Sequence, residues 1–354
     1  MLFRSNILAL IGGGQDPLYP RNKVMLWDDY KAKCFAELEF RSEVLNVRLR
    51  RDKIVVVLQK MVYVYNFADL ALLNKHDTFV NPLGLCALCA DHNNTVLACP
   101  AIKPGHVRLD LFDINKSHII AAHSGELTQL VLNLEGTLLA TASDKGTLIR
   151  VWDTVTGAKV REFRRGTTAA TIFSIAFSRN SNYIIVGSDK GTVHVYALYD
   201  KNNAAAVAAA AAAASASAAA ADGAASAAGG KAAGNVDEGG GAAGGGGGGS
   251  GHGVLMGAAG SAAAASEEDD QSDSVRNKHS RLSFMKDVLP GYFSSEWSFA
   301  SFTVEIPDPS KKFYTAFGAD ESTILVICTD GTYFKYLLRP DQARIVQVGD
   351  ASFK

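Results

Sequence analysis

Short runs of alternating apolar and polar residues recur along the chain. Each is five to eight residues long, is rich in Val, Ile, Leu and aromatic residues, and is separated from the next by turn residues. Period-two alternation over such lengths predicts β-strands rather than helices. We predict strands of this type at residues 22–29, 61–65, 106–113, 147–153, 192–196 and 332–336.

An aromatic residue near the end of these runs recurs about every 40 residues, the period of a four-stranded propeller blade. The positions are Trp27, Tyr65, Phe112, Trp152 and Tyr196. Radial β repeats of this period predict an all-β fold, a β-propeller of the WD-repeat type. About six blades are visible: residues 1–42, 44–80, 85–123, 127–166, 172–305 and 313–350.

One turn sequence supports the repeat. The segment Ser-Asp-Lys-Gly-Thr at residues 143–147 returns unchanged at 188–192, and a shortened copy, Thr-Asp-Gly-Thr, stands at 329–332. Glycine supplies the positive φ that a tight turn needs, and aspartate caps the turn. We predict that these turns join the second and third strands of their blades.

One segment departs from this pattern. Residues 204–266 are almost entirely Ala, Gly and Ser, and the acidic cluster 267–270 follows. Such a segment buries too little apolar surface to offset its ordering entropy, so we predict a disordered insert within a blade loop. The predicted division is propeller blades at 1–203 (five units, the fifth incomplete), the insert at 204–280, and the remaining propeller at 281–354.

Charge and composition exclude several classes. The 354 residues carry 35 Lys and Arg against 36 Asp and Glu, which argues against a protein that coats nucleic acid. We see neither an apolar run long enough to cross a membrane nor a secretory signal. The odd number of cysteines, five, suits buried thiols in a reducing compartment. Cys86 and Cys89 have zinc-like spacing without a second pair, so core thiols are expected, with no metal and no cofactor.

The candidate chemistry lies in Phe-Arg-Arg-Gly at residues 163–166, between the two identical turns. Neighbouring residues on a strand point to opposite sides, so Arg164 would face one blade and Arg165 the next. Each guanidinium would then meet a turn with small hydroxyls and free amides, a combination suited to phosphate. His194, two residues beyond Thr192, shares the face of the second turn. The alternative is a solvated or aspartate-paired arginine pair.

This motif resembles the hallmark of the PROPPINs, seven-bladed WD-repeat-like propellers that bind phosphoinositides and include the WIPI proteins of autophagy. Residues 136–196, 282–286 and 292–300 are also similar to that family. The chain begins at what resembles the second blade. The resemblance therefore predicts a missing first blade, with exposed sheet edges beside residues 1–42 and 313–350.

The resemblance implies two rim pockets for phosphatidylinositol 3-phosphate and phosphatidylinositol 3,5-bisphosphate. The first would use Thr141, Ser143, Gly146, Thr147, Arg150 and Arg164, and the second Arg165, Gly166, Ser188, Thr192 and His194. On a regular strand Thr147 and Arg150 would face oppositely. Either Thr147 belongs to the turn, or a bulge positions Arg150.

The family also inserts a loop of its penultimate blade into the membrane. Here the corresponding residues 276–289 mix basic and bulky apolar side chains, which favour an anionic leaflet. The alternative is that Leu282, Phe284 and Met285 begin the fourth strand of the blade and pack in its core.

We therefore expect a non-enzymatic phosphoinositide effector acting in autophagosome formation. It would be cytoplasmic and peripheral on preautophagosomal, endosomal or vacuolar and lysosomal membranes. The resemblance implies lipid-transfer or conjugation machinery as protein partners, and no nucleic acid. One alternative is a WD-repeat scaffold without lipid binding. Another is an enzyme whose central channel would be lined by clustered acidic or histidine residues.

Overall fold

The computed structural model describes residues 6–198, 277–278, 295–305 and 311–352. These residues form six sheets, antiparallel except for one parallel pairing, and two short 3-10 helices, η1 (Phe112–Ile114) and η4 (Pro340–Gln342). Among them, no helix has the length and apolar character needed to cross a bilayer.

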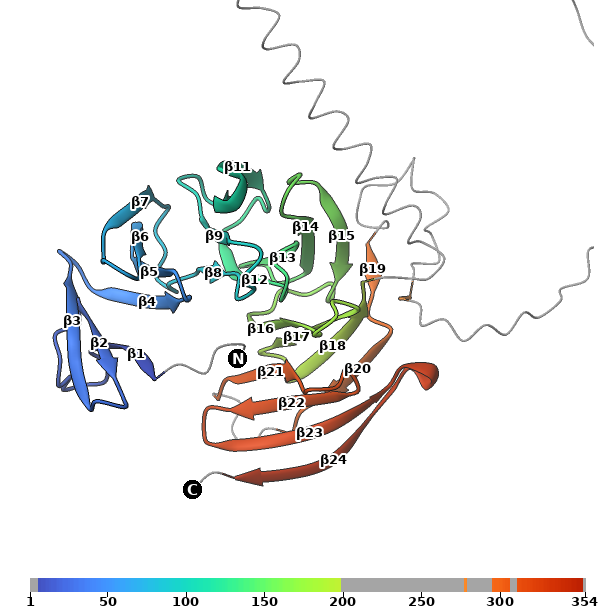
Figure 1. The fold of residues 1–354 in the computed structure, drawn as a ribbon. Helices are drawn as coiled ribbons and strands as arrows, with labels where there is room; N and C mark the ends of the chain where they lie inside the picture. The colour runs from blue at the N-terminus through green and yellow to red at the C-terminus, as the bar shows by residue number, and fades with distance from the viewer. Residues whose placement is uncertain (1–5, 199–276, 279–294, 306–310, 353–354) are drawn as a thin grey trace, which may run out of the picture. The chain divides into compact units, whose positions relative to one another are not determined.

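The first three sheets follow the chain in order (Figure 1). Sheet A contains β1 (Ile7–Ile11), β2 (Lys23–Asp28) and β3 (Lys33–Glu39). Sheet B contains β4 (Val44–Leu49), β5 (Lys53–Leu58), β6 (Met61–Asn66) and β7 (Leu72–Asp77). Sheet C contains β8 (Ala87–Leu88), β9 (Val96–Pro100), β10 (His106–Leu111) and β11 (Lys116–Ala121).

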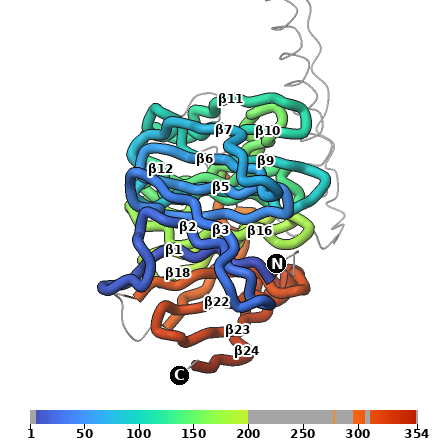
Figure 2. Tube along the Cα trace, turned by 60° about the vertical axis from the view of Figure 1, so that its left-hand side comes forward, coloured from blue at the N-terminus to red at the C-terminus, as the bar shows by residue number. Residues whose placement is uncertain are grey.

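In the last three sheets, a segment that follows β18 (Thr192–Ala197) of sheet E contributes one strand to sheet D and one to sheet E. Sheet D contains β12 (Leu127–Leu132), β13 (Leu138–Ser143), β14 (Leu148–Asp153), β15 (Lys159–Arg164) and β19 (Glu296–Trp297). Sheet E contains β16 (Ile172–Phe177), β17 (Tyr183–Ser188), β18 (Thr192–Ala197) and β20 (Ala300–Thr303). Sheet F contains β21 (Phe313–Phe317), β22 (Thr323–Cys328), β23 (Thr332–Arg339) and β24 (Arg344–Ser352). Within sheets B and F the strands run side by side in chain order (Figure 2).

The core lies between consecutive sheets. Five clusters of buried apolar side chains join A to B, B to C, C to D, D to E and E to F. Strands with both faces in such clusters contain unbroken apolar runs because both faces lose water, as at 54–58 in β5 and 184–186 in β17. The strands β8, β12, β16 and β21 contact one another in succession. The sheets pack face to face, and these first strands contact one another in series. This is the arrangement of an all-β propeller, as the sequence predicted.

The six predicted units correspond to the six sheets, and each predicted run overlaps one strand: β2, β6, β10, β14, β18 and β23. β6 and β18 extend one residue beyond their runs, and β23 extends three. The run at 106–113 was predicted too long. It leaves the sheet after Leu111 because η1 turns the chain, and Asn115 follows in the left-handed region with φ 49°. The repeated turns join second to third strands in sheets D, E and F, as predicted.

The fifth unit is more complex than its predicted boundaries. Within residues 172–305, β19 pairs in parallel with β15 and so belongs to sheet D, whereas β20 completes sheet E beside β18 (Figure 1). The insert and most of the predicted membrane loop, including Leu282, Phe284 and Met285, lie outside the described residues.

Candidate functional site

The two faces of β15 point toward different sheets. Glu162 stands opposite Arg150 of β14, and its Oε2 lies 2.8 Å from the Nε of Arg150. Trp152, two residues beyond Arg150 on the same face, packs in the core shared with sheet C. Arg164 follows Glu162 by two residues, so alternation places it on this same face, toward sheet C.

Phe163 and Arg165, the alternate residues at this end of the strand, face sheet E. The Phe163 ring stacks on Tyr196 of sheet E with a centroid distance of 4.7 Å. Arg165 follows on this side, and its charge contributes to the low pKa of His194 in sheet E. Phe163 and Arg165 therefore face sheet E, and strand alternation places Arg164 on the opposite face of sheet D. Both arginines are buried, and the Tyr196 hydroxyl donates to the Arg164 carbonyl at 3.1 Å, which fixes the strand end between them.

Ser143, Gly146, Thr147, Arg150 and Arg164 form what we call the first cradle, on the sheet-C side. Thr147 lies in the turn before β14, so no bulge is needed at Arg150. Arg150 already has two partners, because it also donates from Nη1 to the Ala122 carbonyl at 2.6 Å.

The ion pair of Arg150 is stably charged. Burial raises the pKa of Glu162, but hydrogen bonds from Arg150, Lys159 and Ser295 outweigh that effect and lower it to about 2. Arg150 is thus committed to a carboxylate, and Arg164 is the other cation of the first cradle.

Thr141 lies beneath the first cradle. Its side chain is fully buried, and its Oγ1 accepts from Trp152 Nε1 at 3.0 Å. The same oxygen lies 3.0 Å from His123 Nε2 and donates to the Arg150 carbonyl at 3.3 Å. A hydroxyl has one proton and two acceptor sites, so these three contacts use its full capacity. We therefore assign Thr141 to the support of the cradle rather than to ligand contact.

Arg165, Gly166, Ser188, Thr192 and His194 form what we call the second cradle, on the sheet-E side. Ser188, Thr192 and His194 share one face, since Val186 pairs with His194 and Gly187 with Val193. Ser188 is fully buried, and its Oγ has no hydrogen-bond partner among the described residues. A Cβ added at Gly166 would meet no atom within 4 Å, so open space adjoins this backbone.

Neutral acceptors hold the cation of the second cradle. Arg165 donates from Nε to the Gly146 carbonyl at 3.0 Å and from Nη2 to the Thr168 carbonyl. In the described part of the chain, no carboxylate lies within ion-pair distance of Arg165. Burial, which outweighs the charge of Asp189, lowers its pKa, yet a guanidinium stays protonated at any physiological pH. The second cradle thus holds a positive charge without an ionic partner.

His194 is neutral at pH 7. Burial and the neighbouring charge of Arg165 lower its pKa to about 4. Its Nδ1 lies 3.1 Å from the Ser298 hydroxyl, and its ring stacks on Tyr196. A neutral imidazole beside a guanidinium and an unused hydroxyl can contribute a hydrogen bond to an anion without adding charge.

Gly146 connects the two cradles. Its φ is +57°, and a Cβ at this position would lie 1.8 Å from the Ala170 carbonyl oxygen. Only glycine fits both the backbone conformation and the space. Its own carbonyl holds Arg165, so the turn of the first cradle positions the cation of the second.

Residues distant in sequence hold sheets D and E together at this seam. Asn277 forms hydrogen bonds with both the N–H and the carbonyl of Ala197 and donates to Glu296 at 2.7 Å. Glu296 also pairs with Arg161 at 3.2 Å, and Ser295 donates to Glu162 at 2.8 Å. The residues 277 and 295–296 therefore connect β18, the third strand of sheet E, to β15, the fourth strand of sheet D.

Sequence reasoning missed several of these supporting groups. Glu162 could have been found, because it lies two residues before Arg164 and alternation puts both on one face. Ser298 gave no signal, since 104 residues separate it from His194. His123 comes from the connection between sheets C and D, and no spacing rule linked it to Thr141.

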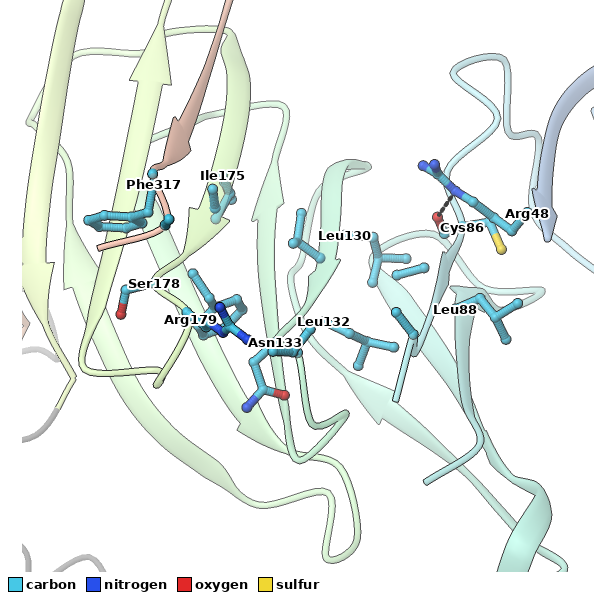
Figure 3. A pocket seen from close by; sticks show the side chains of 18 residues that line it. Arg48, Cys86, Leu88, Leu130, Leu132, Asn133, Ile175, Ser178, Arg179 and Phe317 are labelled. Carbon is cyan, nitrogen blue, oxygen red and sulfur yellow. Dashed lines mark hydrogen bonds between the residues drawn. The ribbon is translucent and has the colours of Figure 1, made fainter. Parts of the chain in front are cut away.

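A separate cavity of about 650 Å³ lies among the first strands of five sheets (Figure 3). Leu88, Leu130, Leu132 and Ile175 contribute to an apolar wall, and Arg48 and Arg179 are the charged residues of the described lining. Arg48 donates from Nε to the Cys86 carbonyl at 3.3 Å. The channel enzyme considered from the sequence requires acidic or histidine residues at this place, and the described lining contains neither.

Two cysteines of the core, Cys86 and Cys99, are buried thiols. Burial raises the pKa of Cys86 to about 12 and that of Cys99 well above its ordinary value. Both belong to the apolar cluster between sheets B and C. The described residues contain no cluster of three or more His, Cys, Asp or Glu side chains that could hold a metal ion.

The sequence of the chain matches a known protein family. The family model described as PROPPIN matches residues 18–223. The chain is 44% identical over 199 residues to Autophagy-related protein 18e of Arabidopsis thaliana, covering 56% of this chain and 53% of that protein. It is 44% identical over 208 residues to SVP1-like protein 2 of Emericella nidulans, covering 58% and 63%. The chain thus spans about half to three fifths of the length of these curated relatives.

Solved structures agree on the fold. The crystal structure of Kluyvelomyces marxianus Hsv2 has a TM-score of 0.64 at 18% identity, covering 99% of this chain and 83% of that one. A complex of KlAtg21 with the coiled-coil of AgAtg16 has a TM-score of 0.63 at 17% identity, covering 100% and 84%. With six propeller sheets, the arginine pair at their seam and a family match over more than half of its length, this chain belongs to the PROPPIN family.

Proposed function

We propose that this chain binds 3-phosphorylated phosphoinositides on membrane surfaces through its two cradles. The ligands would be phosphatidylinositol 3-phosphate and phosphatidylinositol 3,5-bisphosphate. The observation that carries the proposal is the end of β15. There Arg164 pairs with Leu148 directly after the turn at 143–147, and Arg165 lies close enough to Asp189 of the turn at 188–192 and to His194 for their charges to interact.

The second cradle supports the proposal most directly. Among the described residues, Arg165 is a buried cation whose hydrogen bonds go to neutral carbonyls, and the buried Ser188 hydroxyl has no partner; both are costly in a folded protein. A phosphate oxygen would satisfy both, through a charge-assisted bond from Arg165 and a bond from Ser188. The open space beside Gly166 gives the ligand room to approach the backbone.

Two cradles at one seam explain why membranes are the target. A single headgroup contact is weak, but two headgroups on one surface bind the same protein at high effective concentration. The first cradle contributes Arg164 with Ser143 and Thr147, and the second contributes Arg165 with Ser188, Thr192 and His194. Loss of either arginine should therefore weaken membrane binding more than it weakens binding of one soluble headgroup.

The biological role follows from the relatives. A relative named Autophagy-related protein 18e and a structural neighbour in complex with the coiled-coil of AgAtg16 support a role in autophagy. We infer an effector in autophagosome formation that recruits lipid-transfer or conjugation machinery. It would act from the cytoplasm, as a peripheral protein of preautophagosomal, endosomal or vacuolar and lysosomal membranes, and without enzymatic activity.

Liposome flotation tests the proposal. Vesicles with and without phosphatidylinositol 3-phosphate are mixed with the wild type, Arg164→Thr, Arg165→Thr and the double variant. The control, Arg339→Thr, makes the same charge change at an exposed position of sheet F. We expect lipid-specific binding that each single variant weakens, the double variant abolishes and the control retains.

Flotation at increasing salt concentration is a second test, because salt screens the attraction between phosphate and guanidinium. Wild-type binding should fall steeply between 50 and 300 mM salt, about a 2.4-fold change in Debye length. Binding to phosphoinositide-free vesicles that equals binding to loaded ones, or a double variant that floats like the wild type, would contradict the proposal. Either result would favour a scaffold that does not bind lipid.

A further inference from the structure

Three exposed aliphatic side chains gather at one end of sheet C. Ile102 is 69% exposed, Leu83 is 59% exposed and Val80 is 41% exposed. Ile102 lies in the β9–β10 turn, and the other two lie in the loop 79–85 that leads into sheet C. Single exposed apolar residues are ordinary, but a group on adjoining loops marks a contact surface. We call these three residues the apolar rim.

The backbone presents the apolar rim rigidly. The Phe79 N–H donates to the Ala101 carbonyl at 2.7 Å, which joins the loop to the turn. Inside the loop, the buried Asn81 side chain accepts from the Leu85 N–H at 2.8 Å and donates to the Leu85 carbonyl at 3.1 Å. The three side chains therefore stay in water although their loops are fixed, so no internal packing compensates for their exposure.

Contacts connect the apolar rim to the first cradle. The His123 N–H donates to the Gly105 carbonyl at 2.9 Å, so the β9–β10 turn rests on the connection between sheets C and D. In that connection, a Cβ added at Gly125 would lie 2.1 Å from Oδ1 of Asp144, the neighbour of Ser143. A small pocket of about 90 Å³ is lined by Val80, Leu83 and Asp144 together. The apolar rim and the first cradle thus adjoin one another.

The charges around the apolar rim balance. Lys103 and Lys145 are exposed there, as are Glu126 and Asp144. Attraction to an anionic leaflet would therefore contribute little at this place, whereas removal of aliphatic surface from water would contribute directly.

We propose that Val80, Leu83 and Ile102 insert into the interfacial layer of the bilayer while the first cradle holds a headgroup. This inference rests on the proposed function, and it names a membrane contact outside both cradles and outside the loop at 276–289. Burial of one aliphatic side chain at the interface should strengthen vesicle binding about tenfold, and two side chains about a hundredfold.

Vesicle titration tests this contact. The double variant Leu83→Ser/Ile102→Ser is compared with the wild type on vesicles that contain phosphatidylinositol 3-phosphate. Leu72→Ser is the control, because Leu72 is 51% exposed on the outer strand of sheet B. We expect at least a tenfold loss for the double variant and less than a twofold change for the control. Titration of a short-chain soluble phosphatidylinositol 3-phosphate should give equal affinities for all three proteins.

The salt dependence separates the two kinds of contact. Because the apolar rim acts by burial, the affinity ratio between wild type and double variant should stay constant from 50 to 300 mM salt. A ratio that collapses toward one at high salt would overturn the inference, as would a double variant that binds vesicles like the wild type.

Insertion itself can be measured with an Ile102→Trp variant. Vesicles with brominated acyl chains should quench its additional fluorescence, whereas the fluorescence added by Leu72→Trp should be unaffected. Equal quenching of both would overturn the inference, as would the absence of quenching from Ile102→Trp while it floats with vesicles, a result that would favour an apolar protein partner. A wild type that ignores the lipid altogether would refute the proposed function instead, and the soluble-headgroup titration identifies that case.

Discussion

Acid should destabilise the fold through His123. Burial and the neighbouring charge of Arg150 lower the pKa of this histidine to about 4 from its ordinary value of 6.5. The unfolded chain therefore takes up a proton near pH 6.5, whereas the folded chain resists it until about pH 4. The sign follows from this difference: stability is complete above pH 6.5 and is lost as the pH falls through that window.

The pKa values set the size of the effect. A shift of this extent corresponds to about 2–3 kcal/mol of lost stability between pH 7.5 and pH 4.5. That is a large share of the roughly 5–15 kcal/mol that ordinarily separates folded from unfolded states. Protonation would also give Nε2 a fixed N–H, so His123 could then act only as a donor toward Thr141.

Urea unfolding at a series of pH values, with His123→Gln beside the wild type, isolates this group. The amide can still form a hydrogen bond with Thr141, but it does not titrate. Other histidines of low pKa, such as His194, contribute equally to both proteins and cancel in the comparison. The wild type should lose about 2–3 kcal/mol more than the variant between pH 7.5 and pH 4.5. Parallel stability curves for the two proteins would refute the reasoning.

Three further changes have expected outcomes. Gly146→Ala should lower the thermal midpoint by at least about 4 °C, because its positive φ and the nearby Ala170 carbonyl leave no room for a Cβ, whereas Gly166→Ala should not. Equal midpoints for the two variants would contradict that reason. Thr141→Val should lower the unfolding free energy by about 3 kcal/mol yet change vesicle binding less than twofold, since it removes three buried hydrogen bonds but no exposed atom. Cys86 should resist iodoacetamide at pH 8 in the native protein and react after denaturation, as mass spectrometry would show, because burial raises its pKa to about 12.

Local patterns predicted the sheets well. Alternation and the period near 40 residues gave six units, because each blade repeats the same strand and turn requirements. The placement of Arg164 and Arg165 on opposite faces also followed from alternation alone. These features depend on neighbours in sequence, so a single sequence contains the information.

Features that depend on distant segments could not be predicted. The strand β19 has only two residues, and it pairs in parallel with a strand more than 130 positions earlier. The partners of Arg150 and Thr141 come from other strands and from the connection before sheet D. Sequence reasoning therefore proposed the polar residues around the cradles, and the structure adds the hydrogen-bond partners of Arg150 and Thr141.

The pairing of β19 with sheet D links the two sheets that carry the proposed cradles. The same short stretch of chain, 295–303, contributes a strand to sheet D and then a strand to sheet E. Independent sliding or hinging of the two sheets that carry the cradles would therefore strain or break one of these pairings. If both cradles bind headgroups as proposed, the fold sets the distance between the two headgroups. The lipids would then have to rearrange to match the protein, and crowded, laterally mobile headgroups should be captured in preference to sparse ones.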